Sequence, residues 1–297
     1  MSERRYTKEE LIGRFLQGHA SRELSKFPDE CVDSIITSPP YYGQRNYGNG
    51  SQIGVEASPS EYLDNLIDVF YECRRVLKPT GTLWLNVGDK YLNGHLGGLP
   101  WRLAVRLEDE VKLILRSDII WYKPNAMPSS VKNRPTTDHE YIFLFAKSGD
   151  YYYDADVIRK PHITFTEKSR MRGGRNHFGK VDGTPESGKN KGKPNLHDGR
   201  WDQAFHPKGR NKRTVWEIPL SKFREAHFAV FPEKLVETCL LSGCPRGGIV
   251  IDPFMGSGTT ALVAIKLNRR YIGIDSSKKY CEMARKRVQI TRLSLAL

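Results

Sequence analysis

The chain has 297 residues, 38% of them hydrophobic, which suffices for one large α/β domain with a modest insertion, and its net charge of +13 favours a polyanionic partner. Its apolar runs fall short of the ~20 residues that span a membrane, and its charged first ten residues are unlike a signal peptide, so we expect a cytoplasmic protein. Five scattered cysteines without a Cys-x-x-Cys pair argue against zinc or disulfides and predict reduced thiols and no metal.

The first 158 residues carry five predicted strands with helices between them. In the helix expected at 60–77, apolar residues recur at helical spacing after Ser60, which we take as the N-cap. The two strands after the second helix are joined by a polar, proline-containing loop at 123–138, which predicts an antiparallel pair. The predicted strands lie at 14–17, 32–37, 82–87, 113–122 and 140–146, and the helices at 60–77 and 100–109.

The regular pattern is lost at residues 159–213. This stretch holds 15 lysines and arginines against five aspartates and glutamates, a local charge of +10. A localised excess of this kind is what phosphate binding requires, because each neutralised phosphate releases condensed counterions. Composition alone would fit a solvated insertion, but the stretch also carries aromatic residues. We interpret it as an irregular segment that binds nucleic acid, with candidate contacts at Arg170, Arg172, Arg175, Lys189, Lys191 and Lys193.

Regular structure returns with a predicted helix at 232–242. A strand at 248–251, a loop at 252–258 and a helix to about residue 267 follow, then a strand at 271–274 and an amphipathic C-terminal helix. Strands that alternate with helices predict an α/β fold with a doubly wound, mostly parallel sheet of seven strands.

The segment Ile249-Val-Ile-Asp-Pro-Phe-Met-Gly-Ser-Gly-Thr-Thr-Ala261 is a candidate cofactor site. A buried strand leads into a turn in which Gly256 and Gly258 let the backbone approach a ligand at a helix N-terminus. Asp275 follows at the end of the next strand, where its carboxylate can accept hydrogen bonds from ribose hydroxyls. The glycine spacing also matches the dinucleotide fingerprint, so an NAD(P) oxidoreductase stays an alternative at this point.

Ser38-Pro39-Pro40-Tyr41, directly after the second strand, is a candidate catalytic motif. The amino group of cytosine or adenine is a poor nucleophile, since its lone pair is delocalised into the ring. Two acceptors on its N–H groups, Ser38 Oγ and the Pro39 carbonyl, would draw the nitrogen towards tetrahedral geometry. Tyr41 would stack on a base flipped out of the duplex and could also favour a nearby sulfonium cation.

Together the two motifs resemble those of the amino-methylating DNA methyltransferases of the β group, found largely in restriction–modification systems. In that family a Ser/Asp-Pro-Pro-Tyr motif precedes an Asp-Pro-Phe-x-Gly-Ser-Gly motif, and the resemblance spans nearly the whole chain. It includes the blocks that begin at Lys78, Trp121, His139 and His227.

The resemblance implies a permuted, Rossmann-like fold and S-adenosylmethionine as the cofactor. It also implies a catalytic half at 1–158, a target-recognition insertion at 159–213 and a cofactor-binding half at 214–297. The strands before Ser38 and Asp252 should lie side by side at the point where the strand order reverses. One departure is His19, which stands where relatives usually carry Asp near the adenine of the cofactor. The residues that the resemblance places around the cofactor are Asp252, Phe254, Gly256, Ser257, Gly258, Thr259 and Phe231.

The choice of target rests on Ser38. Ser before Pro-Pro-Tyr is the family's usual mark of cytosine-N4 enzymes, so we expect methylation of cytosine N4 in double-stranded DNA, with adenine N6 as the alternative. Carbon-5 methylation needs a cysteine nucleophile, and the chain has no Pro-Cys dipeptide. From other classes, an NAD(P) oxidoreductase and a non-catalytic DNA-binding protein stay as alternatives. A restriction endonuclease that cuts the same site is the expected companion.

Overall fold

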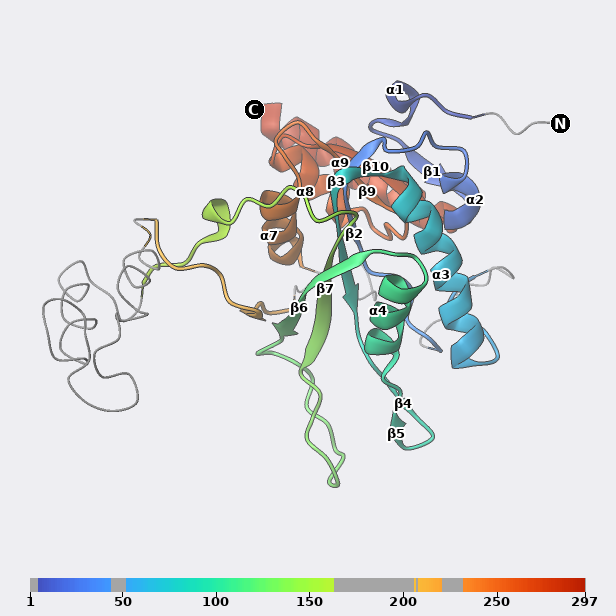
Figure 1. The fold of residues 1–297 in the computed structure, drawn as a ribbon, viewed down its shortest axis with the longest axis vertical. Coiled ribbons are helices and arrows are strands. Elements are labelled where there is room, and N and C mark those ends of the chain that lie inside the picture. The colour runs from blue at the N-terminus through green and yellow to red at the C-terminus, as the bar shows by residue number, and fades with distance from the viewer. Residues whose placement is uncertain (1–4, 44–51, 163–205, 207, 221–231, 297) are drawn as a thin grey trace, which may run out of the picture. The chain divides into compact units, whose positions relative to one another are not determined.

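A mixed β-sheet runs through the larger of two units into which this computed structural model divides (Figure 1). The structure describes residues 5–43, 52–162, 206, 208–220 and 232–296. One unit comprises Met1–Tyr153 and Thr214–Leu297, and the other Asp154–Arg213. No described helix is both long enough and apolar enough to cross a membrane.

The sheet has eight strands in the order β1-β10-β9-β2-β3-β7-β6-β8. Strands β1, β10, β9, β2 and β3 are parallel neighbours, whereas β7 lies antiparallel between β3 and β6. The predicted doubly wound, mostly parallel α/β fold is therefore confirmed. The strand bounds are β1 Phe15–Gln17, β2 Val32–Thr37, β3 Leu77–Val87, β6 Ile114–Tyr122, β7 His139–Ala146, β8 Val215–Glu217, β9 Ile249–Asp252 and β10 Arg270–Asp275.

Strand β8 is one strand more than the seven predicted. It is three residues long and pairs in parallel with the end of β6. Only Trp216 of the three is buried, and so short a segment carries no readable periodicity. A second difference is the start of β3 at Leu77, since we expected a helix at 60–77 and a strand only from residue 82. There Val32 pairs with Leu77, and a register shift follows before Ser34 pairs with Thr82.

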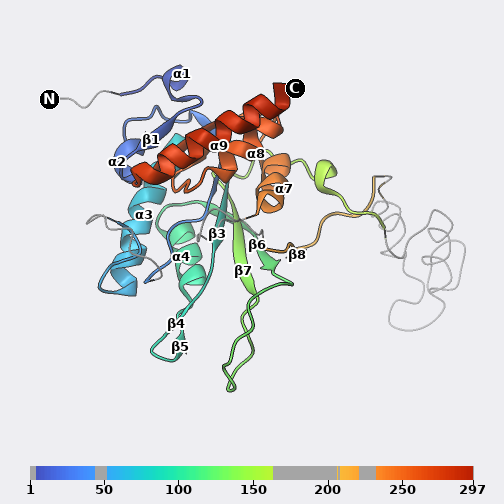
Figure 2. The same cartoon turned by 180° about the vertical axis from the view of Figure 1, so that it is seen from behind.

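Helices cover both faces of the sheet. Successive strand residues point to opposite sides, and apolar side chains on each side need a helical layer to bury them. In β2, Ile35 packs with the core on the side of α3 and α4, whereas Ile36 packs with the core on the side of α7, α8 and α9. Figures 1 and 2 show these two helical layers from opposite sides. The helices are α1 Lys8–Leu11, α2 Ala20–Leu24, α3 Pro59–Val76, α4 Leu99–Asp109, α7 Glu233–Gly243, α8 Thr259–Lys266 and α9 Lys278–Ala296.

The N-cap that we expected for α3 is wrong by two residues. Ser58 accepts the backbone N–H of Glu61 at 3.2 Å, and Pro59 occupies the first helical position. Proline is favoured there because that position has no intrahelical partner for an N–H. A small hairpin, β4 Tyr91–Leu92 with β5 His95–Leu96, was also not predicted.

The unit Asp154–Arg213 contains the predicted insertion. Its described part holds a 3-10 turn, η1 Asp156–Ile158, and an antiparallel bridge between Lys160 and Arg210. Asp156 pairs with Arg159 at 2.7 Å and with Lys208 at 3.1 Å. These cations, Arg159 first, lower the pKa of Asp156 to about 2.

Candidate functional site

The two sequence motifs meet at the carboxyl ends of neighbouring strands. Strand β2, which precedes Ser38, pairs in parallel with β9, which ends at Asp252. From β2 the sheet continues to β3 on one side, and from β9 to β10 on the other, so the strand order reverses between them. The adjacency implied by the resemblance is therefore confirmed, and ligands of doubly wound sheets bind at such a point.

A buried carboxylate joins the motifs. Asp252 is 1% exposed and accepts the Thr37 hydroxyl at 2.7 Å and the Thr260 hydroxyl at 2.8 Å. The Phe254 backbone N–H donates to it as well, at 3.1 Å. Burial raises the pKa of Asp252 to about 6, against the lowering effect of these donors. The structure thus shows Asp252 holding the strand before Ser38 against the glycine loop, and its expected contact with a cofactor stays a prediction.

The glycine loop has the left-handed backbone that its sequence requires. Gly256 has φ +50° and Gly258 φ +81°, a region that L side chains adopt at a cost. A Cβ on Gly258 would lie 2.8 Å from the Cβ of Ala284 in α9, whereas one on Gly256 would meet no described atom within 4 Å. The loop is therefore packed against α9 on one side and open at Gly256.

Asp275 contacts this loop directly. One of its oxygens accepts the Gly256 N–H at 2.9 Å and the other accepts the Ser277 N–H at 2.8 Å. Burial raises the pKa of Asp275, and the two backbone donors lower it. The carboxylate is partly exposed at the end of β10, so it can accept further hydrogen bonds from a ligand.

Arg287 is a loop contact that sequence reasoning missed. From α9 its guanidinium donates to the backbone carbonyl and to the hydroxyl of Ser257, both at 2.7 Å. Thr259, at the start of α8, lies within 3.5 Å of the same nitrogen. The C-terminal helix is rich in charged residues, and no spacing marks this one as facing inwards.

The Ser38-Pro39-Pro40-Tyr41 turn is held by α3. The Tyr62 hydroxyl, on a side chain only 2% exposed, donates to the Pro40 carbonyl at 2.9 Å. No hydrogen bond from a described residue reaches the Pro39 carbonyl, which is the acceptor that we expected to serve the substrate. Ser38 donates to the Tyr41 hydroxyl at 3.3 Å.

A polar cluster behind this turn was also missed. The Tyr41 hydroxyl donates to Glu140 at 2.6 Å, and Asn86 donates to both, at 2.9 and 2.8 Å. Lys123 forms an ion pair with the other oxygen of Glu140. Burial, and next the charge of Glu140, raises the pKa of Tyr41 well above its usual value. Glu140 stands in the block that begins at His139, but nothing in its spacing links it to Tyr41.

His19 follows the carboxyl end of β1, at the same end of the parallel strands as Asp275. It precedes α2, and its Nδ1 is 2.9 Å from the Ser21 hydroxyl oxygen. The preceding Gly18 donates its N–H to the Asp275 carbonyl at 3.0 Å. Burial, followed by the charge of Arg22, lowers the pKa of His19. The residue that departs from the family pattern is therefore close in the fold to the predicted ribose contact.

Several predicted site residues fall outside the described part of the chain. These are Phe231 of the cofactor set and all six candidate DNA contacts, Arg170, Arg172, Arg175, Lys189, Lys191 and Lys193. Among the described residues, no group of three or more His, Cys, Asp or Glu side chains is placed to hold a metal ion.

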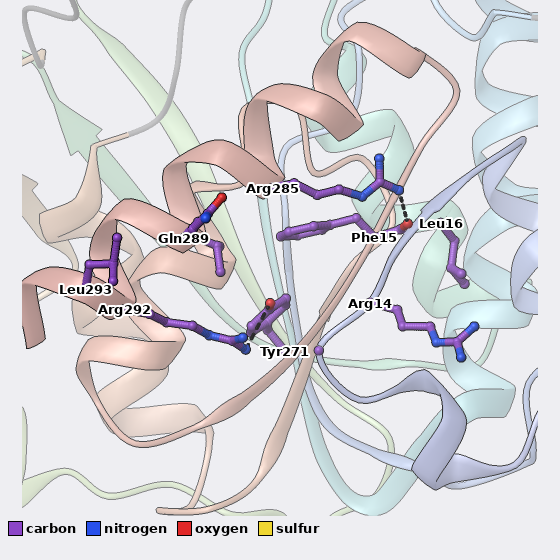
Figure 3. Close-up of a pocket in the computed structure, with 10 residues that line it drawn as sticks. Arg14, Phe15, Leu16, Tyr271, Arg285, Gln289, Arg292 and Leu293 are labelled. Atoms are coloured by element: carbon purple, nitrogen blue, oxygen red, sulfur yellow. Dashed lines mark hydrogen bonds between the residues drawn. The ribbon is translucent and has the colours of Figure 1, made fainter. Parts of the chain in front are cut away.

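A groove of about 620 Å³ lies elsewhere on the larger unit (Figure 3). It is lined by Phe15 and Tyr271, near the amino ends of β1 and β10, and by α9. There Arg285 donates to the Phe15 carbonyl at 2.9 Å, and Arg292 lies over the Tyr271 ring. None of the predicted site residues lines this groove. It lies near the amino ends of the parallel strands, whereas Ser38 follows the carboxyl end of β2.

Comparison with known proteins gives the family. A sequence model described as DNA methylase (N6_N4_Mtase) matches residues 32–286. This chain belongs to that family of DNA methylases.

Curated relatives of this methylase cover nearly its whole length. It is 36% identical to the type II methyltransferase M.SmaI of Serratia marcescens, over 93% of this chain and 90% of the relative. It is 37% identical to M.Cfr9I of Citrobacter freundii, over 94% and 89%. These matches confirm the predicted membership of the amino-methylating, restriction–modification type.

Solved structures agree with the fold of the methylase. The PvuII DNA methyltransferase (cytosine-N4-specific) superimposes with a TM-score of 0.66 at 20% identity, over 94% of this chain and 91% of that one. A Thermus thermophilus protein described as a DNA modification methylase, in complex with S-adenosyl-L-methionine, matches with a TM-score of 0.60 at 26% identity. It covers 94% of this chain and 95% of its own.

We predict that Asp252 makes the stability of the methylase depend on pH. A carboxyl whose pKa is raised on folding, here to about 6, contributes stability that is present below its unfolded pKa and lost as the pH rises through 6. Between pH 5 and pH 7.5 the free energy of unfolding should therefore fall by about 1.4 kcal/mol more in the wild type than in Asp252→Asn. Urea unfolding at both pH values measures this difference, and parallel pH dependences would contradict it.

We also predict that Gly258→Ala is more damaging than Gly247→Ala. Both glycines have positive φ, +81° and +74°, so each substitution should cost roughly 1–2 kcal/mol of backbone strain. Only Gly258→Ala adds a clash, with Ala284, and only Gly258 belongs to the glycine loop. Thermal unfolding should show a larger loss of stability for Gly258→Ala than for Gly247→Ala. Calorimetry with S-adenosylmethionine should show a loss of affinity for Gly258→Ala only. Equal behaviour of the two variants would mean that the packing against α9 does not matter.

Proposed function

We propose that this DNA methylase transfers a methyl group from S-adenosylmethionine to the exocyclic N4 amino group of a flipped cytosine in double-stranded DNA. S-adenosylmethionine is the methyl donor of the family and supplies an electrophilic sulfonium methyl. The observation that carries the proposal is the hydrogen bond between Thr37 and Asp252, at 2.7 Å, since it fixes the turn at Ser38 beside the glycine loop.

The residues at the glycine loop fit this cofactor. The open side of Gly256 leaves room for a ligand against the backbone, and the partly exposed Asp275 carboxylate can accept ribose hydroxyls. We assign Phe254, Ser257, Gly258 and Thr259 to the wall of the same pocket, and Phe231 by family pattern. Asp252 supports this wall through its bonds to Phe254 and Thr260.

The turn at Ser38 fits an amino group as the methyl acceptor. The Pro39 carbonyl is free of donors from the described residues, and Ser38 directs its proton towards Tyr41. Both oxygens can therefore accept hydrogen bonds from one –NH₂ group, which favours the tetrahedral nitrogen of the transition state. Tyr41 would stack on the flipped base, a contact worth roughly 1–3 kcal/mol.

The preference for cytosine N4 over adenine N6 rests on Ser38 in place of Asp or Asn. Adenine N6 is the second candidate, and it would use the same fold, cofactor and acceptors. The NAD(P) oxidoreductase and non-catalytic alternatives have no support among the family and relatives. Because relatives such as M.SmaI are type II methyltransferases, we propose a companion restriction endonuclease and action on DNA in the cytoplasm.

We predict that Ser38→Ala lowers kcat on the order of 100-fold, as the loss of one hydrogen-bonding group at a developing charge does elsewhere. Affinities for DNA and for S-adenosylmethionine should change little, because the contact matters most in the transition state. Ser294→Ala, on the exposed end of α9, serves as the control. The wild-type product, identified as nucleosides by mass and chromatography, should be N4-methylcytosine. N6-methyladenine would overturn the choice of base, and 5-methylcytosine would overturn the mechanism.

The basic segment gives a separate prediction about DNA binding. Replacing Arg170 and Arg172 by Gln should weaken binding and reduce the slope of log affinity against log salt by about 0.9 for each phosphate that is no longer neutralised. Affinity for S-adenosylmethionine should not change. Lys278→Gln with Lys286→Gln, on α9, removes the same charge elsewhere and should leave the slope unchanged. An unaltered slope in the arginine variant would mean that the segment does not contact phosphates.

A further inference from the structure

Glu140 has no part in the function as proposed so far, yet it ends a directed chain of hydrogen bonds that begins at Ser38. Ser38 donates to Tyr41 at 3.3 Å, and Tyr41 donates to Glu140 at 2.6 Å. Ser38 and Tyr41 come from the turn that follows β2, and Glu140 comes from the start of β7. Asn86, at the end of β3, binds to all three residues. The hydrogen-bond chain therefore spans the neighbouring strands β2, β3 and β7, at the end of the sheet where β2 and β3 finish (Figure 1).

The direction of this chain is set by its charged end. A carboxylate can only accept hydrogen bonds, so the Tyr41 hydroxyl must donate to it, and the oxygen of Tyr41 is left to accept from Ser38. The raised pKa of Tyr41, caused first by burial, keeps that hydroxyl protonated and able to donate. Ser38 Oγ also accepts the Asn86 side-chain amide at 3.3 Å. With its proton directed to Tyr41, Ser38 keeps one lone pair, and no proton, for a substrate.

Glu140 is itself held on both oxygens. Lys123 pairs with one of them, and the side chains of Lys123 and Glu140 are each only 15% exposed. Asn86 donates to the other at 2.8 Å. Since its –NH₂ faces Glu140, the Asn86 amide orientation is fixed, and its buried Oδ1 has no hydrogen-bond partner among the described residues. Lys123 and Asn86 thus hold the Glu140 carboxylate in one position, and the unpartnered Asn86 oxygen makes this arrangement costly.

The chemistry explains why direction matters. The amino group of a base offers two N–H donors, and its lone pair is delocalised, so a serine that pointed its proton at this group would make no useful bond. Ser38 can polarise the group only as an acceptor. We propose that Glu140 is a positioning residue for methyl transfer: it orients the Tyr41 and Ser38 hydroxyls so that Ser38 presents an acceptor to the target amino group. This inference rests on the proposed function.

Two substitutions break the chain at different points. Glu140→Gln keeps the shape but removes the charge that sets the direction, and it leaves Lys123 unpaired. Tyr41→Phe keeps the ring for stacking and leaves the ion pair of Lys123 and Glu140 intact. Glu110→Gln is the matched control. It also replaces a carboxylate that is paired with a cation, because Glu110, directly after α4, pairs with Arg106 of that helix, away from the turn at Ser38.

We expect Glu140→Gln and Tyr41→Phe each to lower kcat about 10- to 100-fold, the usual loss for a group that orients a reacting residue. KM for DNA and Kd for S-adenosylmethionine should stay within about twofold, and Glu110→Gln should match the wild type. Because both variants break one chain, the double variant should be no slower than the slower single variant. Wild-type kcat in either variant, a loss confined to KM, or multiplicative losses in the double variant would each overturn the proposal.

A second measurement does not depend on turnover. With ¹³Cζ-labelled tyrosine, the Tyr41 signal, assigned from Tyr41→Phe, should shift in Glu140→Gln and stay in place in Glu110→Gln. An unmoved signal would mean that Glu140 does not orient Tyr41, whatever the reaction. If the wild type makes no amino-methylated base, the proposed function fails on that result, while the tyrosine signal still decides whether Glu140 holds the chain.

Discussion

The hydrogen bond between Thr37 and Asp252 is the contact on which the site depends. It joins residues 215 positions apart in the chain, and both lie in the buried interior at the ends of adjacent strands. A buried carboxylate is unfavourable unless donors compensate it, and here two hydroxyls and one backbone N–H do so. The same bonds that make the carboxylate tolerable also fix the turn at Ser38 relative to the glycine loop.

Each half of the site is then supported from a different layer of the fold. On the cofactor side, α9 holds the loop through Ala284, which packs against Gly258, and through Arg287, which binds Ser257. On the acceptor side, α3 holds the Pro-Pro turn through Tyr62, and β7 supplies Glu140. Both turns of the proposed site are short, and rigid helices and strands fix them from behind.

Positive charge is distributed unevenly along the chain. The larger unit supplies the sheet, the turn and the glycine loop, whereas the excess of arginine and lysine lies at residues 159–213. The turn at Ser38 is itself built from neutral groups, and the Glu140 carboxylate behind it is paired with Lys123. This distribution of charge fits the proposed neutral amino acceptor at Ser38 and the proposed contact of the basic segment with DNA phosphates.

The sequence by itself determined the fold class, seven of the eight strands of the large sheet, the two motifs and the family, because these depend on local periodicity and on contiguous residues. It placed Ser38 next to Asp252 only through the family's strand order. It erred on the cap at Ser58, where a proline at the next position decides the helix start.

Only the tertiary structure decided which side chains support the motifs. Thr37, Glu140 and Arg287 carry no local signal, because their partners lie 17 to 215 residues away and are reached only when strands pair and α9 packs on the sheet. Strand β8 exists for the same reason: three residues with a single buried tryptophan become a strand because the end of β6 offers them unpaired backbone groups.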